Sequence, residues 1–254
     1  MNARRMLYGA LPVITLIVMW ETVTGLNPAL RRFLPPFSLV VEELFHMTVS
    51  GVLLNNLVSS LLRVIIGFSL GSALGIAVGI LMGYSKIMYE MLNPILSFLY
   101  PIPALGWLPL LMIWIGVGEM LPIAIIFICS FFPTAYTTAT GVRTVDKRLV
   151  RAAETLGASQ INVLKTVVLP LALPAIFTGL RLEAGMGWRV IVAAEMVAIP
   201  TGIGALFMQA ESLIRIDIIL ACLLVLAVMC FLFEKIFQHL EARVCRWVKT
   251  YGQG

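Results

Sequence analysis

Six long apolar segments dominate this chain and restrict how it can fold. A helix needs roughly 20 predominantly apolar residues to cross the hydrocarbon core of a bilayer. Of the 254 residues, 60% are hydrophobic and only 12% are charged, which is more apolar surface than a soluble domain of this length can bury. The sequence therefore predicts an all-α integral membrane protein with about six transmembrane helices, near residues 7–26, 57–82, 91–115, 121–141, 177–199 and 216–237.

The first apolar segment differs from the others in its surroundings. Arg4 and Arg5 precede it, as in a secretory signal, but Trp20-Glu21-Thr22 follows where a small-residue cleavage site would stand. We therefore expect an uncleaved helix at the edge of a five-helix core. On this basis residues 1–55 form an N-terminal transmembrane helix with its periplasmic connection, residues 56–237 the membrane core, and residues 238–254 a basic cytoplasmic tail.

The distribution of Lys and Arg among the connections predicts the orientation. Thirteen of the 18 lie on one side of the membrane, in the termini, the connections and the adjoining ends of the spans, and three lie on the other side. Cytoplasmic connections carry the excess of Lys and Arg. Both termini and the 142–176 connection are therefore expected in the cytoplasm.

The 142–176 connection has the pattern of two short helices. Leu149, Ala152, Ala153 and Leu156 recur at the spacing of one helix face, after Asp146 as a capping residue and before Gly157 as a terminator. Ser159 is placed to cap a second short helix, which Pro170 and Pro174 are expected to stop or kink. From the residues alone, the first helix is either a docking element for another protein or an amphipathic helix lying among lipid headgroups.

The same connection resembles the EAA loop of ABC importer permeases. The resemblance is carried by the spacing of Ala152, Ala153, Gly157, Val167, Leu169 and Pro170. Four further segments resemble the sulfonate, taurine and nitrate branch of these permeases: 60–63, 101–109, 116–119 and 193–196. One departure is Arg151, which stands where the family most often has Glu, while an acid appears at Glu154.

The resemblance implies a type I importer permease, with residues 56–237 as its ABC transmembrane type-1 domain and a cytoplasmic coupling helix. Such a permease pairs with a second permease subunit, two ABC ATPase subunits and a periplasmic or lipid-anchored substrate-binding protein in the bacterial cytoplasmic membrane. The expected cargo is a small anionic solute. The chain has no GxxxxGK[ST] phosphate loop, so ATP and Mg²⁺ are assigned to the ATPase and no cofactor to this chain. The ATPase-coupling residues implied are Leu149, Arg151, Ala152, Ala153, Glu154, Leu156 and Gly157.

Two features inside the membrane suggest a substrate path. Pro101 and Pro103 interrupt the third apolar segment, and broken helices either line a substrate path or are packing kinks. Arg189 lies near the middle of the fifth segment, where an ionisable residue is by default a candidate functional site. Its partner is expected to be an anionic substrate, Glu195 of a second subunit, or a free backbone carbonyl.

Three other residues are candidates for the path or its gate. Arg63, near the outer end of the second segment, is expected to extend to the lipid headgroups. Glu195 is expected to act as a gate or to pair two helices. Trp188 could line the path or fill the core.

A membrane-embedded enzyme and a secondary transporter are the two alternative classes of protein. A membrane-embedded enzyme is disfavoured because His46 and His239 lack the HExxH spacing and no paired acidic motif is present; neither catalytic nor metal-binding residues are expected. An ion- or proton-coupled secondary transporter of a small anion remains the alternative, although such proteins usually have more spans arranged as repeats.

Overall fold

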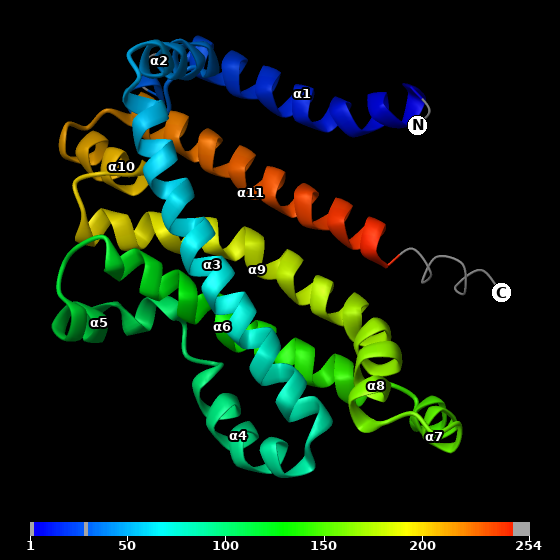
Figure 1. The fold of residues 1–254 in the computed structure, drawn as a ribbon. Helices are drawn as coiled ribbons and strands as arrows, with labels where there is room; N and C mark the ends of the chain where they lie inside the picture. Colours follow the sequence, from blue (N-terminus) through cyan, green and yellow to red (C-terminus); the bar gives the residue numbers. More distant parts are fainter. Residues whose placement is uncertain (1–2, 28–29, 246–254) are drawn as a thin grey trace.

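The computed structural model describes residues 3–27 and 30–245, and every element within these ranges is a helix. Figure 1 shows the arrangement. In chain order the elements are α1 (Ala3–Leu26), η1 (Leu30–Arg32), α2 (Phe37–Val49), α3 (Val52–Tyr84), α4 (Lys86–Leu99), η2 (Ala104–Trp107), α5 (Leu108–Ile115), α6 (Met120–Arg143), α7 (Lys147–Thr155), α8 (Gln160–Val163), η3 (Leu164–Val168), α9 (Leu169–Ala198), α10 (Ile203–Ser212) and α11 (Ile216–Val244).

Four helical runs among the described residues are long and apolar enough to cross a membrane: α3, α6, the continuous run from α8 to α9, and α11. The expected third span is a broken helix. It consists of α4 and the segment 104–115, which are bent by 86° around Pro101 and Pro103. Counted as one crossing, this pair gives up to five spans; within α1, residues Leu11–Leu26 form a shorter apolar helix. Among the described residues, length and composition therefore give four or five spans and do not confirm the expected count of six.

A row of glycines brings α3 against α6. Gly67, Gly71, Gly75, Gly79 and Gly83 recur every four residues and so lie along one side of α3. A methyl group added to Gly71 would stand 2.5 Å from the carbonyl oxygen of Phe127, and one on Gly75 would stand 2.8 Å from that of Phe131. The two backbones therefore approach more closely than any larger side chain allows, as in the small-residue contacts of membrane helices.

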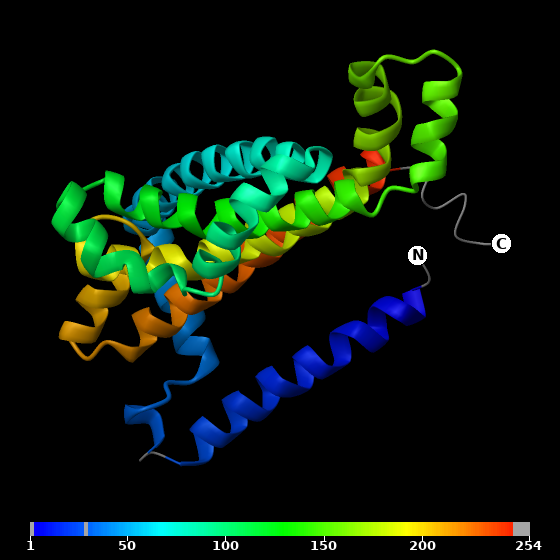
Figure 2. The same cartoon turned by 90° about the horizontal axis from the view of Figure 1, so that it is seen from below.

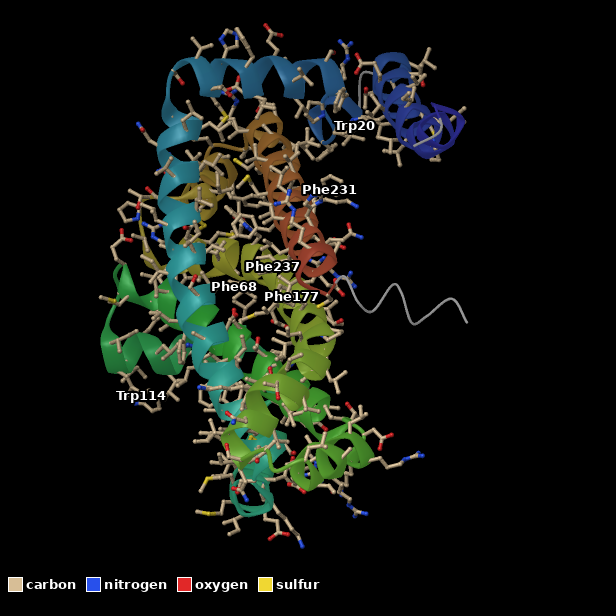
Figure 3. All side chains as sticks on the ribbon, turned by 45° about the vertical axis from the view of Figure 1, so that its right-hand side comes forward. Trp20, Phe68, Trp114, Phe177, Phe231 and Phe237 are labelled. Carbon is tan, nitrogen blue, oxygen red and sulfur yellow. The ribbon has the colours of Figure 1, made fainter. Side chains whose placement is uncertain are left out.

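Aromatic side chains fill the space between α3, α9 and α11. Phe68 and Phe237 meet edge to face with their ring centroids 5.2 Å apart, and Phe177 lies beside them (Figure 3). Trp188 of α9 is fully buried and meets Phe233 of α11 in the same way, at 5.4 Å. These contacts close the core on the side opposite α6.

The first helix lies apart from this bundle, as the sequence predicts. Figure 2 shows α1 separated from the other long helices and joined to them through α2. The Trp20 indole donates to the Pro35 carbonyl oxygen at 3.0 Å, and Ser38 donates to both carboxylate oxygens of Glu21. The start of α2 therefore fixes the far end of α1.

The long axis of the molecule has two distinct ends (Figures 1 and 2). One end carries α7, together with the start of α1 and the last turns of α11; the other carries α2 and α10, and is called the α10 end below. Pro170 and Pro174 do not stop the helix that leads from α7 into the bundle, which excludes the first of their two expected effects, a stop or a kink. The wider π-type turn of η3 precedes Pro170, and α8, η3 and α9 run on as one helix.

Candidate functional site

Capping side chains build the short helix α7 at one end of the molecule. The Asp146 carboxylate accepts a hydrogen bond from the Arg148 amide at 2.8 Å and starts the helix. At its end the Gly157 amide bonds to the Glu154 carbonyl, and the Ala158 amide to the Ala153 carbonyl, with Gly157 at φ +85°. This is a Schellman ending, and its left-handed residue is one that glycine adopts without strain.

The two faces of α7 have different environments. Leu149 is 49% exposed and Leu156 89% exposed, and Ala152 lies on the same outward face. Ala153 does not share that face, contrary to the expected pattern; with Val150 it packs against the core. Neighbouring residues of a helix are about 100° apart, and here this separation turns Ala153 toward the core while Ala152 stays outward. The outward apolar face is therefore Leu149, Ala152 and Leu156.

A basic groove lies beneath α7. It has a volume of about 650 Å³ and runs between α7 and the ends of α3 and α6. Its charged lining residues are Lys86, Arg143, Lys147, Arg151 and Glu154. Arg151, the departure from the EAA pattern that this connection resembles, is thus one of four cations around a single acid in the lining of the groove.

A buried arginine organises the α10 end. Arg63 of α3 is 3% exposed, and all five of its N–H donors have acceptors. Glu119 receives two of these bonds at 2.6 and 2.7 Å, Glu195 one at 2.7 Å, and Thr201 two through its carbonyl and hydroxyl oxygens. The Arg63 guanidinium holds the pKa of the Glu119 carboxyl below its usual range.

The same cluster caps α10. The amides of Gly202, Ile203 and Gly204 donate to Asn56, Ser60 and Glu195, respectively, at 2.7 to 3.0 Å. These are backbone groups at a helix start that have no partner within the helix. Gly202, at φ +109°, has no room for a side chain because the Glu195 carboxylate occupies that space.

A cavity of about 350 Å³ lies at the break between α4 and η2. Pro101 and Pro103 form part of one wall, and α9 contributes Glu183, Met186 and Val190 to the other. The remaining lining residues are mostly apolar or aromatic: Tyr100, Ile102, Ala104, Leu105, Ile128, Cys129, Phe132 and Pro133. A volume of this size fits a small molecule.

Comparison with known proteins identifies the family. The model of the family described as "Binding-protein-dependent transport system inner membrane component" matches residues 71–246. The chain belongs to this family. It is thus a multi-pass permease subunit of an ABC transporter in the inner membrane, which decides against the enzyme and the secondary transporter.

Curated relatives and a solved structure agree with this permease assignment. The taurine transport system permease protein TauC of Escherichia coli (strain K12) is 38% identical over 239 residues, covering 91% of this chain and 86% of that protein. The putative aliphatic sulfonates transport permease protein SsuC of Bacillus subtilis (strain 168) is 32% identical over 243 residues, covering 96% and 88%. The MetNI methionine ABC transporter in an inward-facing conformation matches with a TM-score of 0.66 at 16% identity, over 78% of this chain and 98% of that chain. The last comparison shows that the fold is that of a type I importer permease.

The reach of Arg63 to the headgroups and the pairing of Arg189 with Glu195 are wrong expectations, whereas the helix-pairing role expected as one alternative for Glu195 is present. Arg63 does not extend to the lipid headgroups, because Glu119 and Glu195 hold it inside the bundle. Glu195 is fully buried and pairs α9 with α3, so it is not accessible to Arg189 of a second subunit. Three of the segments quoted for the branch resemblance, 60–63, 116–119 and 193–196, meet at this cluster, which sequence spacing alone did not reveal.

The remaining path candidates of the permease separate in space. Trp188 lies in the core and not on the cavity wall. Arg189 is exposed, and its guanidinium lies 3.6 Å from the Met186 sulfur, next to the cavity but outside its lining. The charged residue inside the cavity is Glu183, which the sequence analysis did not select, although an acid in the middle of an apolar segment is as unusual as Arg189.

Proposed function

We propose that this permease forms the translocation path of an ATP-driven importer of a small anionic solute of the sulfonate type. Two relatives that align along nearly the whole chain carry taurine or aliphatic sulfonate transport in their names. The importer would contain a second copy of this chain, two ABC ATPase subunits and a periplasmic or lipid-anchored binding protein. This chain would bind no cofactor of its own, since ATP and Mg²⁺ belong to the ATPase.

The outward face of α7 is the single observation that carries the coupling part of this proposal. Leu149, Ala152 and Leu156 form an apolar patch on a helix that stands away from the bundle (Figure 2). Small and apolar side chains on an exposed helix fit a groove of a partner protein. The ATPase would therefore bind the apolar face of α7, with Arg151, Glu154 and Gly157 at the edge of the contact.

The same assignment gives the orientation and the cycle. The start of α1 and the end of α11 lie at the α7 end, and Lys and Arg are concentrated in the same parts of the chain, so we assign this end to the cytoplasm. Closure of the two ATPases would draw the two α7 helices together. The short helix α8, which follows α7, continues through η3 directly into α9. This movement would therefore turn α9 and open the cavity beside it to the other side of the membrane.

A substitution at Gly157 tests the coupling. Its backbone is left-handed, and an added Cβ would meet no other atom within 4 Å, so within the permease the main effect of Gly157→Val is backbone strain. Gly157→Val should separate ATP hydrolysis from uptake in the reconstituted transporter, whereas Gly157→Asn, which tolerates this conformation, should keep them coupled. Equal coupling in the valine variant and the wild type would overturn the docking assignment.

A further inference from the structure

The mid-span cavity contains a carboxyl group without a charged partner. Glu183 is the fifteenth of the 30 residues of α9 and is only 9% exposed. Among the described residues its one polar contact is the Cys129 thiol, with Sγ 3.8 Å from Oε2. A buried carboxylate with so weak a partner is costly. Without a cation the carboxyl avoids this cost by holding a proton, and a bound cation would stabilise its ionised form.

The cavity's lining limits what that group can be. Glu183 is the one charged side chain among the described residues that line it, and the surrounding walls are mostly apolar and aromatic. Such a site attracts a cation and repels an anion that carries no cationic group. Both the attraction and the repulsion are strong because little water is present to screen the charges. An ionisable residue at this depth in a transport protein commonly marks the substrate path.

We propose that Glu183 binds the protonated amino group of the transported solute, so that the cargo is a small zwitterion with an amine in addition to its anionic group. An ammonium group supplies the positive charge and three N–H donors that the carboxylate lacks. Nitrate and simple alkanesulfonates carry no such group. This assignment rests on the proposed function, since it narrows the substrate class of the same path.

Two sulfonates of nearly equal size test the proposal. The complete transporter is reconstituted in vesicles, and ATP-dependent uptake of 2-aminoethanesulfonate is compared with that of 2-hydroxyethanesulfonate. Glu183→Gln should reduce uptake of the amine roughly tenfold or more, as expected for loss of a buried charge partner. Uptake of the hydroxyl compound, which the Glu183 carboxylate repels, should not fall below its wild-type level. Glu183→Asp should retain part of the amine uptake, and Glu90→Gln, at an exposed carboxylate on α4, serves as the matched control.

Uptake that falls equally for both solutes would overturn the proposal, because it would assign Glu183 a structural pairing role. Uptake of the amine that does not fall in Glu183→Gln would also overturn it. A wild-type transporter that imports neither sulfonate would count against the proposed function and leave the cavity to be tested directly.

Chemical labelling supplies that direct test without any binding protein. Met186 lines the cavity, and Met186→Cys in the purified complex can be modified by a cationic 2-aminoethyl or an anionic 2-sulfonatoethyl methanethiosulfonate, with the unsubstituted complex as the blank. The ratio of cationic to anionic modification rates should fall several-fold when Glu183→Gln is added. An unchanged ratio would overturn the proposal, whatever the transport result.

Discussion

The Arg63 guanidinium lies 2.7 Å from the Glu195 carboxylate and joins α3 to α9 inside the bundle. Removing one partner of a buried ion pair leaves the other charge unpaired, at a cost of about 3–5 kcal/mol. Arg63→Met and Glu195→Gln should therefore each lower the thermal unfolding midpoint of the purified transporter markedly. Lys86→Met, which breaks an exposed pair with Glu90, should cost about 1 kcal/mol or less. Similar losses in all three variants would show that the buried cluster has no special role.

Glu119 makes the stability of this cluster depend on pH. Its hydrogen bonds to Arg63 lower the pKa of its carboxyl in the folded protein. The stabilisation is thus fully present above the unfolded pKa of about 4.3 and is lost as the pH falls through the lower folded value. The difference in unfolding midpoint between the wild type and Glu119→Gln should be largest near neutral pH and should shrink below about pH 4. A constant difference across this range would contradict the assignment of the shift to Glu119.

The sequence predicted local features better than contacts between residues that are far apart in the chain. Asp146, Ser159 and Gly157 act within a few residues of themselves, and the structure confirms their capping roles. Arg63 lies 56 residues from Glu119 and 132 residues from Glu195, and no helical spacing relates residues so far apart. From the sequence, Arg63 could therefore be assigned only a local interaction, in which its side chain extends to the lipid headgroups.

The close contact between α3 and α6 predicts a steep dependence on side-chain size. A methyl group on Gly75 would already stand 2.8 Å from the Phe131 carbonyl oxygen, and backbone cannot move aside as a flexible side chain can. Gly75→Leu should destabilise the permease by at least the 1–3 kcal/mol typical of an overpacked core, seen as a lower unfolding midpoint and lower yield in the membrane. Gly118→Ala, at a position with no atom within 4 Å, is the control and should be neutral. A neutral Gly75→Leu would mean that the two helices are not in contact in the membrane.

The exposed apolar face of α7 predicts which substitutions release the ATPase. Leu156 is 89% exposed and contributes nothing to the permease core, so Leu156→Glu should leave the unfolding midpoint of the isolated permease unchanged. The same substitution places a charge in the proposed contact and should reduce the amount of ATPase that co-purifies roughly tenfold or more, as expected for a central apolar anchor. Val150→Glu is the opposite case, because Val150 packs against the core and its loss should lower the stability of the permease itself. Full recovery of the ATPase with Leu156→Glu would show that the partner binds elsewhere on the α7 end.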